Sequence, residues 1–346
     1  MVGQSTIVCI PDTSVGALPH ACAYIRLLLP LSRPEVLNEF RVNYAHSTTY
    51  DRMKPSIIVT QRLAFAADGT LDRLLRHRGE QGARLVYDID DDLLAIDRDH
   101  NEYAHYAAAA PMIKQMIAEA DEVWVSTAAL LQRVNALGGK GVLLENELDS
   151  RLWPAPPVST VDEPVRVLYM GTTTHQADFE SIIVPSVGAL VREFSRSQVE
   201  FELIGVAKSA PSPWKVRTPP GAVQASYPAF CHWLRNQPSF SIGVAPLSDT
   251  AFNRGKSHIK WLEYSAIGAV TVASAIGEYG ASITDGVNGV LTDNSVDGFH
   301  ANLRGLVIDR SRLQALRTRA SAEVARRLRE MRVARARLAR LRDLAA

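Results

Sequence analysis

Short apolar runs alternate with amphipathic stretches along most of the chain. Runs of four to seven residues are typical of buried strands, and the stretches between them have the three- and four-residue spacing of helices. Alternation of this kind predicts parallel βαβ units. Pro30 is expected to end the first helix. The expected strands cover residues 5–10, 40–44, 56–60, 84–89, 122–126, 141–144, 165–170, 200–204, 239–245 and 270–273, and the expected helices cover residues 20–31, 68–77, 102–120, 127–137, 181–194 and 257–267.

A proline-rich stretch interrupts this alternation. Residues 153–160, WPAPPVST, have no helical or strand periodicity and are typical of a linker between domains. A chain of 346 residues is also long for a single core. We therefore expect an N-terminal domain over residues 1–150, a linker over 151–164 and a C-terminal domain over 165–310. Each domain is expected to be a doubly wound α/β sheet, and the cleft between them is the expected ligand site.

The last part of the chain, residues 311–346, predicts one long basic helix. Its apolar residues recur mostly every three or four positions, and eleven arginines stand among three acidic residues. This pattern favours a helix packed across both domains, with a peripheral contact to a membrane surface as the alternative. No aromatic side chains alternate with the arginines, which disfavours nucleic-acid binding. The apolar positions are Leu313, Leu316, Ala320, Val324, Leu328, Met331, Leu338 and Leu341.

Composition adds few constraints. The 38 basic residues nearly balance the 37 acidic residues, so the global charge indicates no partner. The three cysteines (Cys9, Cys22 and Cys231) are scattered and predict neither a metal site nor a disulfide framework. The N-terminal residues lack the pattern of a signal peptide, and no apolar run is long enough to cross a bilayer. We therefore expect a cytoplasmic protein, with the inner face of the membrane as an alternative location.

Two lysines and a glutamate stand at the start of the expected helix over residues 257–267. Ser257 is expected to cap this helix, and a helix N-terminus attracts phosphate through its free N–H groups. Lys256 and Lys260 would add positive charge there, and Glu263 could accept hydrogen bonds from two hydroxyls of a ribose. These residue types together indicate a nucleoside-diphosphate site. An ordinary amphipathic helix with a surface Lys260–Glu263 pair is an equally open interpretation.

This segment resembles a known family. The run KSHIKWLEYSAIGAVTVAS at residues 256–274, followed by DGVNGVL at 285–291, resembles the donor-binding region of GT-B glycosyltransferases, in the large retaining group called family 4. The Asn-x-x-Lys-Ser-x-x-Lys order at 253–260 is similar to the polysaccharide and O-antigen enzymes of that group. The run YMGTTTH at 169–175 resembles the glycine loop of their donor domain. The run VLLENELD at 142–149 resembles the segment where their first domain passes to the second.

The resemblance implies a GT-B fold, with two Rossmann-like domains on either side of a cleft. It also implies transfer of a hexose from a nucleotide-diphospho-sugar to a glycan or lipid-linked acceptor in surface polysaccharide synthesis, without a metal or other cofactor. Lys256 would take part in catalysis, because it meets the diphosphate where negative charge develops. His175 could contact the donor or instead cap the helix that begins near Asp178. The implied donor contacts are Gly171, Thr172, His175, Asn253, Lys256, Ser257, Lys260 and Glu263.

One position departs from the family pattern. The family has a further glutamate eight positions before the one that matches Glu263, and this chain has Gly255 there. In the family that glutamate lies near the transferred sugar and is linked to catalysis. The departure leaves retention or inversion of the sugar open, and it makes a non-catalytic binding protein an alternative.

Four aspartates stand at the end of one expected strand, in the run VYDIDDDLL at residues 86–94. The run resembles the nucleophile motif of haloacid-dehalogenase phosphatases. A metal-dependent phosphohydrolase that uses Asp88 and Asp90 is therefore an alternative function. That motif usually opens its fold, whereas several expected strands precede it here, and the later motifs of the class have no convincing match.

The GT-B interpretation gives the same aspartates another role. Related polysaccharide enzymes have a similar acidic loop followed by a histidine, which corresponds to His100 here. The resemblance implies that Asp90, Asp91 and Asp92 bind an acceptor hydroxyl or cap and fix the loop, with His100 near the donor sugar, and one of these carboxylates could serve as general base. Because Asp91 would lie in the N-terminal domain, its substitution is expected to leave nucleotide affinity unchanged. A solvated acidic turn is the remaining interpretation.

Overall fold

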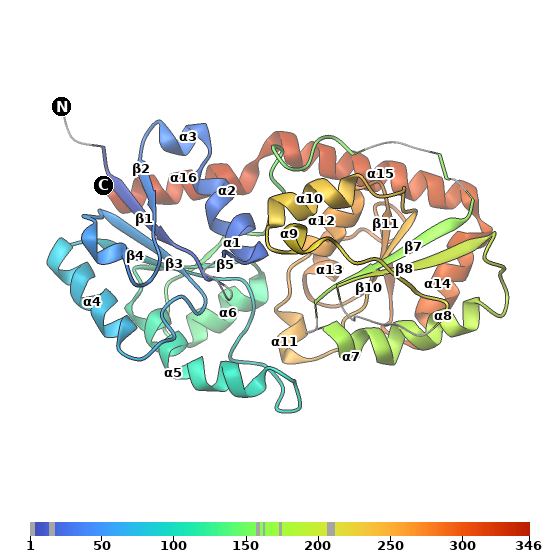
Figure 1. Cartoon of the computed structure of the whole chain (residues 1–346), viewed down its shortest axis with the longest axis horizontal. Coiled ribbons are helices and arrows are strands. Elements are labelled where there is room, and N and C mark those ends of the chain that lie inside the picture. The colour runs from blue at the N-terminus through green and yellow to red at the C-terminus, as the bar shows by residue number, and fades with distance from the viewer. Residues whose placement is uncertain (1–3, 14–17, 157–159, 162, 173–174, 206–211) are drawn as a thin grey trace.

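The structure is a computed structural model that contains two parallel six-stranded sheets side by side, with helices packed around each (Figure 1). A helical segment at the end of the chain runs along both sheets (Figure 1). The predicted α/β architecture with two doubly wound sheets is therefore confirmed. The structure describes residues 4–13, 18–156, 160–161, 163–172, 175–205 and 212–346.

The first sheet comes from the N-terminal part of the chain, and with its helices it is called the N-terminal half. Each neighbouring pair of strands is parallel. The strands are rich in valine and isoleucine and are largely buried, as strands of parallel sheets covered on both faces are. In spatial order they are β2 (Arg41–Tyr44), β1 (Thr6–Ile10), β3 (Ile57–Gln61), β4 (Arg84–Ile89), β5 (Glu122–Val125) and β6 (Gly141–Leu143).

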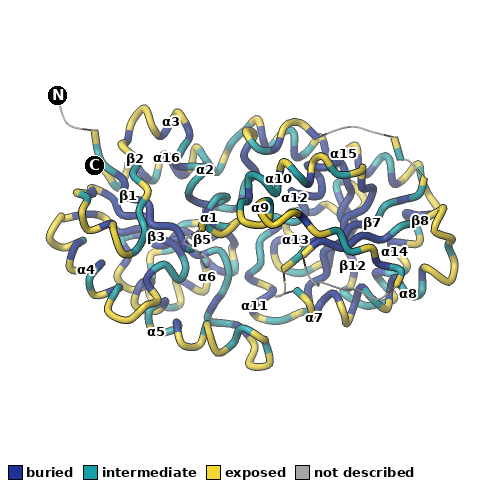
Figure 2. Tube along the Cα trace, viewed as in Figure 1, coloured by how far each residue is buried: buried dark blue, intermediate teal, exposed yellow. Residues whose placement is uncertain are grey.

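The second sheet follows the proline-rich stretch, and with its helices it is called the C-terminal half. Its neighbouring strands are parallel as well. Burial is concentrated in these two sheets, and the segments around them are more exposed (Figure 2). In spatial order the strands are β12 (Val290–Thr292), β11 (Val270–Ser274), β10 (Ile242–Ala245), β7 (Val165–Met170), β8 (Val199–Ile204) and β9 (Lys215–Val216).

Helices connect the strands in both halves. Those of the N-terminal half are α1 (Ala21–Ala23), α2 (Leu29–Leu31), α3 (Pro34–Leu37), α4 (Thr70–Gln81), α5 (Tyr103–Glu119) and α6 (Ala128–Ala136). Those of the C-terminal half are α7 (Gln176–Asp178), α8 (Val184–Leu190), α9 (Gly221–Gln224), α10 (Tyr227–Arg235), α11 (Ala251–Arg254), α12 (Ile259–Ala266), α13 (Gly277–Ser282) and α14 (Val296–Ile308).

Two of the predicted helices contain π-helical turns. A π-helical turn over Tyr24–Leu28 joins α1 to α2, and this helix ends at Leu31, directly after Pro30, so its predicted end near Pro30 is confirmed. The wider turn relieves the clash that a proline ring causes in a regular α-helix. A second π-helical turn over Phe179–Ile183 joins α7 to α8, so the helix predicted over residues 181–194 begins and ends earlier.

The predicted long C-terminal helix is present, and a single residue, Met331, divides it into two parts. Helix α15 (Arg310–Glu330) ends where Met331 adopts a left-handed conformation with φ of 46°, and α16 (Arg332–Ala345) follows. This break carries the chain from the C-terminal half back to the N-terminal half (Figure 1). Val324 packs in the core of the C-terminal half, and Leu341 packs in the core of the N-terminal half.

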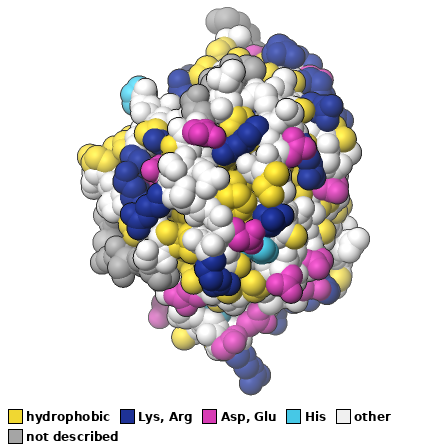
Figure 3. Space-filling model, turned by 90° about the vertical axis from the view of Figure 1, so that its right-hand side faces the viewer, with side chains coloured by type: hydrophobic (Ala, Val, Ile, Leu, Met, Phe, Trp, Pro, Cys, Tyr) yellow, Lys and Arg dark blue, Asp and Glu magenta, His cyan; other side chains and the backbone are white. Residues whose placement is uncertain are grey.

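The surface shows no dominant charge where it can be seen in Figure 3. On that face basic and acidic side chains are interspersed, in keeping with the formal net charge of +1 (Figure 3). No helix among the described residues is both long enough and apolar enough to cross a membrane. The apolar stripe of α15 and α16 is largely buried against the two halves, as are Arg317 and Arg337, whereas the other arginines of these helices are at least partly exposed.

Candidate functional site

The two halves meet where the acidic run after β4 faces the segment before α12. Lys256 Nζ lies 3.3 Å from Asp91 Oδ1 across this junction. The hydroxyl of Thr127 donates to the carbonyl oxygen of Gly255 at 3.2 Å. The predicted donor and acceptor residues are therefore in direct contact, although they are more than 150 positions apart in the sequence.

Asp88, the first aspartate of the run, is a fully buried structural residue. Its carboxylate accepts hydrogen bonds from Arg26, with Nε–Oδ1 at 2.9 Å and Nη2–Oδ2 at 2.8 Å, and from Gln61 at 3.1 Å. Arg26 also donates to the carbonyl of Leu144 and to Asn146 Oδ1. A carboxylate enclosed in this way cannot attack a phosphate ester, so the structure disfavours the phosphohydrolase alternative.

Arg62 holds the next two carboxylates from their own half. Its Nη1 lies 2.7 Å from Asp90 Oδ1 and 3.3 Å from Asp91 Oδ2. Burial raises the pKa of Asp90, and the neighbouring carboxylate of Asp91 adds to the rise. Burial also opposes ionisation of Asp91, but Lys256 and Arg62 outweigh it and lower the pKa of Asp91. Asp91 is therefore the more easily ionised carboxylate of this pair.

Gly255 has little room for a side chain because the acidic run packs against it. A β-carbon at this position would lie 3.3 Å from the carbonyl oxygen of Phe252 and 3.4 Å from the β-carbon of Asp92. Asp92 is itself held toward Arg133, with 3.6 Å between Oδ2 and Nε. The close approach of the halves thus gives a packing reason for glycine where the family that this chain resembles has a glutamate.

Ser257 does not cap α12, contrary to prediction. The N-cap residue is His258, whose side chain makes no capping hydrogen bond. The hydroxyl of Ser257 instead accepts a hydrogen bond of 2.8 Å from the side-chain amide of Asn146. Because Asn146 also accepts from Arg26, a continuous polar chain links buried Asp88 to the start of α12.

Glu263 is a buried carboxylate on α12 with two partners. Lys260 Nζ lies 2.8 Å from Oε2, and the hydroxyl of Tyr227 donates to Oε1 at 3.1 Å. The Lys260–Glu263 pair therefore exists, but the glutamate is only 3% exposed, so it is not the surface pair of the alternative interpretation. A carboxylate offers about four acceptor positions, so Glu263 can accept further hydrogen bonds from a ligand.

Asp178 organises the loops beside these lysines. It accepts hydrogen bonds from the backbone N–H and the hydroxyl of Ser248, and Asn253 donates to the Ser248 carbonyl at 3.0 Å. His175 occupies the N-cap of α7 without a capping hydrogen bond, and its Nδ1 lies 3.9 Å from Asp178 Oδ2. Burial lowers the pKa of His175, and the nearby charge of Lys256 adds to the decrease, which favours a neutral imidazole.

Phe252 connects His100 to the lysine. Lys256 Nζ lies 4.2 Å from the centroid of the Phe252 ring, a cation–π distance. The ring of His100 lies 6.0 Å from the same ring, and its Nδ1 accepts a hydrogen bond from the backbone N–H of Glu102. The structure therefore brings His100 to the junction of the two halves.

The loop after β7 passes very close to the loop after β8. The N–H of Gly171 donates to the carbonyl of Ile204, and a β-carbon at Gly205, where φ is +86°, would lie 2.4 Å from the carbonyl oxygen of Gly171. Thr172 is the next residue after Gly171 in this loop. The rest of the predicted glycine loop, Thr173 and Thr174, lies outside the described residues.

Several residues of the junction had no signal in the sequence. Arg62 and Tyr227 are isolated polar residues that reach the site only through the fold. Glu278 accepts a hydrogen bond of 2.9 Å from the N–H of Ala128 at the start of α6, which is another contact between the halves. Within the described residues, no group of three or more His, Cys, Asp or Glu side chains has an arrangement that could hold a metal ion.

Comparisons with known proteins match the whole architecture. Neither a protein-family model nor a curated protein sequence matches the chain. Anabaena HepE in complex with UDP and glucose superposes with a TM-score of 0.67 at 12% identity, covering 99% of this chain and 100% of HepE. Sucrose-phosphate synthase from Thermosynechococcus elongatus gives 0.65 at 13% identity, with 99% and 100% covered. The catalytic domain of starch synthase IV from Arabidopsis thaliana, bound to ADP and acarbose, gives 0.64 at 9% identity, with 99% of each covered.

These structures are GT-B glycosyltransferases, and the match extends over nearly all of each chain. The chain therefore has the GT-B fold. With identities this low, the likeness establishes the fold, and the chemistry has to be argued from the site itself.

Proposed function

We propose that this chain is a glycosyltransferase that takes a hexose from a nucleotide-diphospho-sugar. The observation that carries the proposal is the group of Lys256, Lys260 and buried Glu263 around the start of α12, opposite the acidic run of the other half. Solved neighbours support it, since HepE is in complex with UDP-glucose and starch synthase IV is bound to ADP.

The donor would bind along α12. Lys256 and Lys260 supply positive charge for the diphosphate, next to the free N–H groups of the first helical turn. Glu263 lies farther along the helix, where it can accept hydrogen bonds from ribose hydroxyls while Tyr227 holds its other oxygen. Because the lysines supply the compensating charge, we propose that the reaction needs no metal ion.

In the transfer step, the bond between the anomeric carbon and the diphosphate oxygen breaks and a bond to the acceptor oxygen forms. Negative charge grows on the departing diphosphate, where Lys256 would stabilise it. As the new bond forms, the acceptor hydroxyl gives its proton to a carboxylate of the acidic run or to the departing diphosphate oxygen. Asp90, Asp91 and His100 of the other half would orient that hydroxyl, because Asp91 lies beside Lys256 and His100 packs against Phe252.

The ion pair between Asp91 and Lys256 changes one expectation from the sequence. Asp91 was expected to be irrelevant to nucleotide affinity because it lies in the other half. Its carboxylate is instead the anion nearest to Lys256, so it competes with a diphosphate for the same ammonium group. Donor binding would have to weaken this pair, and departure of the nucleotide would restore it.

The proposed acceptor is a glycan or lipid-linked sugar of a surface polysaccharide, made in the cytoplasm. A lipid-linked acceptor would bring the chain to the inner face of the membrane. The exposed arginines of α15 and α16 would then contact anionic lipid, because the apolar stripe of these helices is already buried.

Release of nucleotide from activated sugars tests the proposal. The chain would be incubated with UDP-, GDP-, ADP- and dTDP-sugars without acceptor, with a CMP-sugar as a control that lacks the diphosphate. We expect slow hydrolysis of one diphosphate donor and its loss in Lys256→Ala. Binding of a diphosphate without hydrolysis, even with acceptors added, would favour the non-catalytic alternative, and no binding of any donor would contradict the proposal.

A further inference from the structure

A cavity lies at the place where the chain passes between the halves. Its volume is about 460 Å³, within the range of small-molecule sites. Residues 143–148, where the chain leaves the N-terminal half, form one side of it. The other side is formed where the chain returns through α15 and α16, by Val324, Arg326, Arg327, Leu328, Arg332, Val333 and Ala336. Among the described residues that line it, none belongs to the group of Lys256, Lys260, Glu263 and His175.

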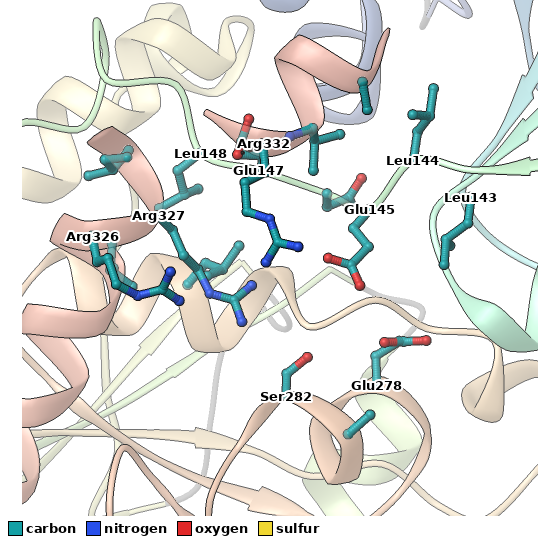
Figure 4. A pocket seen from close by; sticks show the side chains of 17 residues that line it. Leu143, Leu144, Glu145, Glu147, Leu148, Glu278, Ser282, Arg326, Arg327 and Arg332 are labelled. Carbon is teal, nitrogen blue, oxygen red and sulfur yellow. Dashed lines mark hydrogen bonds between the residues drawn. The ribbon is translucent and has the colours of Figure 1, made fainter. Parts of the chain in front are cut away.

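The walls of this cavity carry opposite charges. The guanidinium groups of Arg327 and Arg332 lie on one side, and the carboxylates of Glu145 and Glu278 lie on the other (Figure 4). The N-terminus of α16, where Arg332 is the first helical residue, adds no free charge to the basic wall, because Glu147 accepts hydrogen bonds there from the N–H groups of Val333 and Ala334. On the acidic wall, burial raises the pKa of Glu278. The nearby charge of Glu145 adds to this rise, and the hydrogen bond from the Ala128 N–H offsets it only in part.

The charges that face the cavity are only partly neutralised by the protein. Arg327 donates from Nε to Glu323 and stacks over Trp261 with 4.9 Å to the ring centroid, and no hydrogen bond within the described residues uses its two terminal nitrogens. Within the described part of the chain, Arg332 and Glu145 take part in no ion pair or side-chain hydrogen bond, either with each other or with another residue. Opposite charges that share a cavity without pairing are complementary to a molecule that carries both charges.

We propose that this cavity binds a small zwitterion of the size of an amino-sugar phosphate. Its anionic group would lie between Arg327 and Arg332, and its ammonium group would lie between Glu145 and Glu278. The apolar side chains of the lining, such as Leu148 and Leu328, would contact the carbon skeleton. A neutral ligand or an ion of one sign would leave one wall uncompensated, and burial of such charges is unfavourable.

Three commercial probes test the anionic group and the ammonium group of the proposed ligand separately. Glucosamine 6-phosphate carries both groups, glucose 6-phosphate lacks the ammonium, and glucosamine lacks the phosphate. In calorimetric titrations of the full chain we expect glucosamine 6-phosphate to bind most tightly. Loss of either group should weaken binding about tenfold or more, because hydrogen bonds to charged groups contribute at that level.

Matched variants assign the charges to residues. Arg332→Gln should weaken glucosamine 6-phosphate about tenfold and leave glucosamine unchanged, and Glu145→Gln should remove the preference over glucose 6-phosphate. Arg329→Gln is the control, because Arg329 is exposed on α15 and does not line the cavity. Thermal unfolding of each variant would establish that it is folded. We expect the variants to fold, because the substituted side chains make few interactions within the protein.

The result that would overturn the proposal is equally specific. Absence of heat with all three probes at millimolar concentration would mean that the cavity holds only water and salt. If Arg332→Gln and the unchanged chain bind glucosamine 6-phosphate equally well, Arg332 does not hold its phosphate and the proposal is wrong. If Lys256→Ala no longer binds glucosamine 6-phosphate, the probe binds in the donor region. If Lys256→Ala still binds it, the result supports the cavity between residues 143–148 and the two C-terminal helices. None of these outcomes depends on glycosyl transfer.

Discussion

The acidic run after β4 and the basic start of α12 face each other, yet their charges are neutralised in different ways. In the acidic run, arginines of the same half pair with the carboxylates: Arg26 with Asp88, Arg62 with Asp90 and Arg133 with Asp92. At the start of α12, Lys256 reaches across to Asp91 of the other half. Pairs within one half form as that half folds, whereas a pair across the junction can be exchanged for a ligand when the halves move. The first kind should therefore control stability and the second kind nucleotide binding.

The largest effect is expected from the buried pair of Asp88 and Arg26. Asp88→Asn leaves the guanidinium of Arg26 buried without a counter-charge, which should lower the free energy of unfolding by about 3–5 kcal/mol. Chemical denaturation monitored by tryptophan fluorescence measures this loss. Asp92→Asn is the matched control, because the Asp92 side chain is 14% exposed and lies 3.6 Å from Arg133, which is itself largely exposed, and it should change the free energy of unfolding by less than about 1 kcal/mol. Normal stability of Asp88→Asn would show that the carboxylate is not structural.

The next largest effect is expected on turnover. Lys256→Ala removes the cation nearest to the departing diphosphate, and removal of one such donor lowers kcat by about a hundredfold in comparable sites. Nucleotide affinity should fall less than kcat, because charge on the diphosphate is greatest in the transition state. Steady-state assays with the donor that is hydrolysed would measure both. A drop in affinity with kcat unchanged would mean that Lys256 binds only the ground state.

Glu263→Gln should reduce nucleotide affinity about ten- to a hundredfold, because a charged acceptor for ribose hydroxyls is lost. Tyr227→Phe removes only a hydrogen bond to the same carboxylate and should have a smaller effect of the same sign. Calorimetry with the ribonucleotide and its 2′,3′-dideoxy form distinguishes a ribose contact from general damage. If Glu263→Gln weakens both forms equally, the ribose assignment is wrong.

The smallest effect is expected from Asp91, and it has the opposite sign. Asp91→Asn frees Lys256 from a competing anion, so nucleoside diphosphates should bind up to about tenfold more tightly, as expected for one exchanged ion pair. Asp92→Asn is again the control, because Asp92 faces Arg133 and should leave nucleotide affinity unchanged. The gain should disappear when Lys256→Ala is already present. If Asp91→Asn raises the nucleotide affinity equally with and without Lys256, the gain comes from the lower negative charge of the acidic run as a whole and not from the pair with Lys256.

Local patterns were enough to predict the architecture. Alternating apolar runs predicted ten of the twelve strands that the described residues form, because parallel strands buried on both faces are short and almost wholly apolar. The two that were missed, β9 and β12, have only two and three residues. The break at Met331 was also missed, since the apolar stripe continues through it and the cause is the change of packing partner from one half to the other.

The site was predictable where its residues share one element and unpredictable where they meet through the fold. Lys256, Lys260 and Glu263 stand close together in sequence, so their grouping could be read directly. The reach of Asp91 to Lys256 could not, because it depends on how the halves dock. The same holds for Arg62, whose role as the partner of two carboxylates follows only from the neighbouring positions of β3 and β4.

The central claim is that α12 and its two lysines form a nucleoside-diphosphate site, and calorimetric titration tests it most directly. UDP, GDP, ADP and dTDP would be titrated into the unchanged chain and into Lys256→Ala, with EDTA present throughout. The account predicts saturable binding of at least one nucleotide by the unchanged chain without metal, and clearly weaker binding by Lys256→Ala. Absence of binding by the unchanged chain, or equal affinity of the two proteins for the nucleotide, would contradict it.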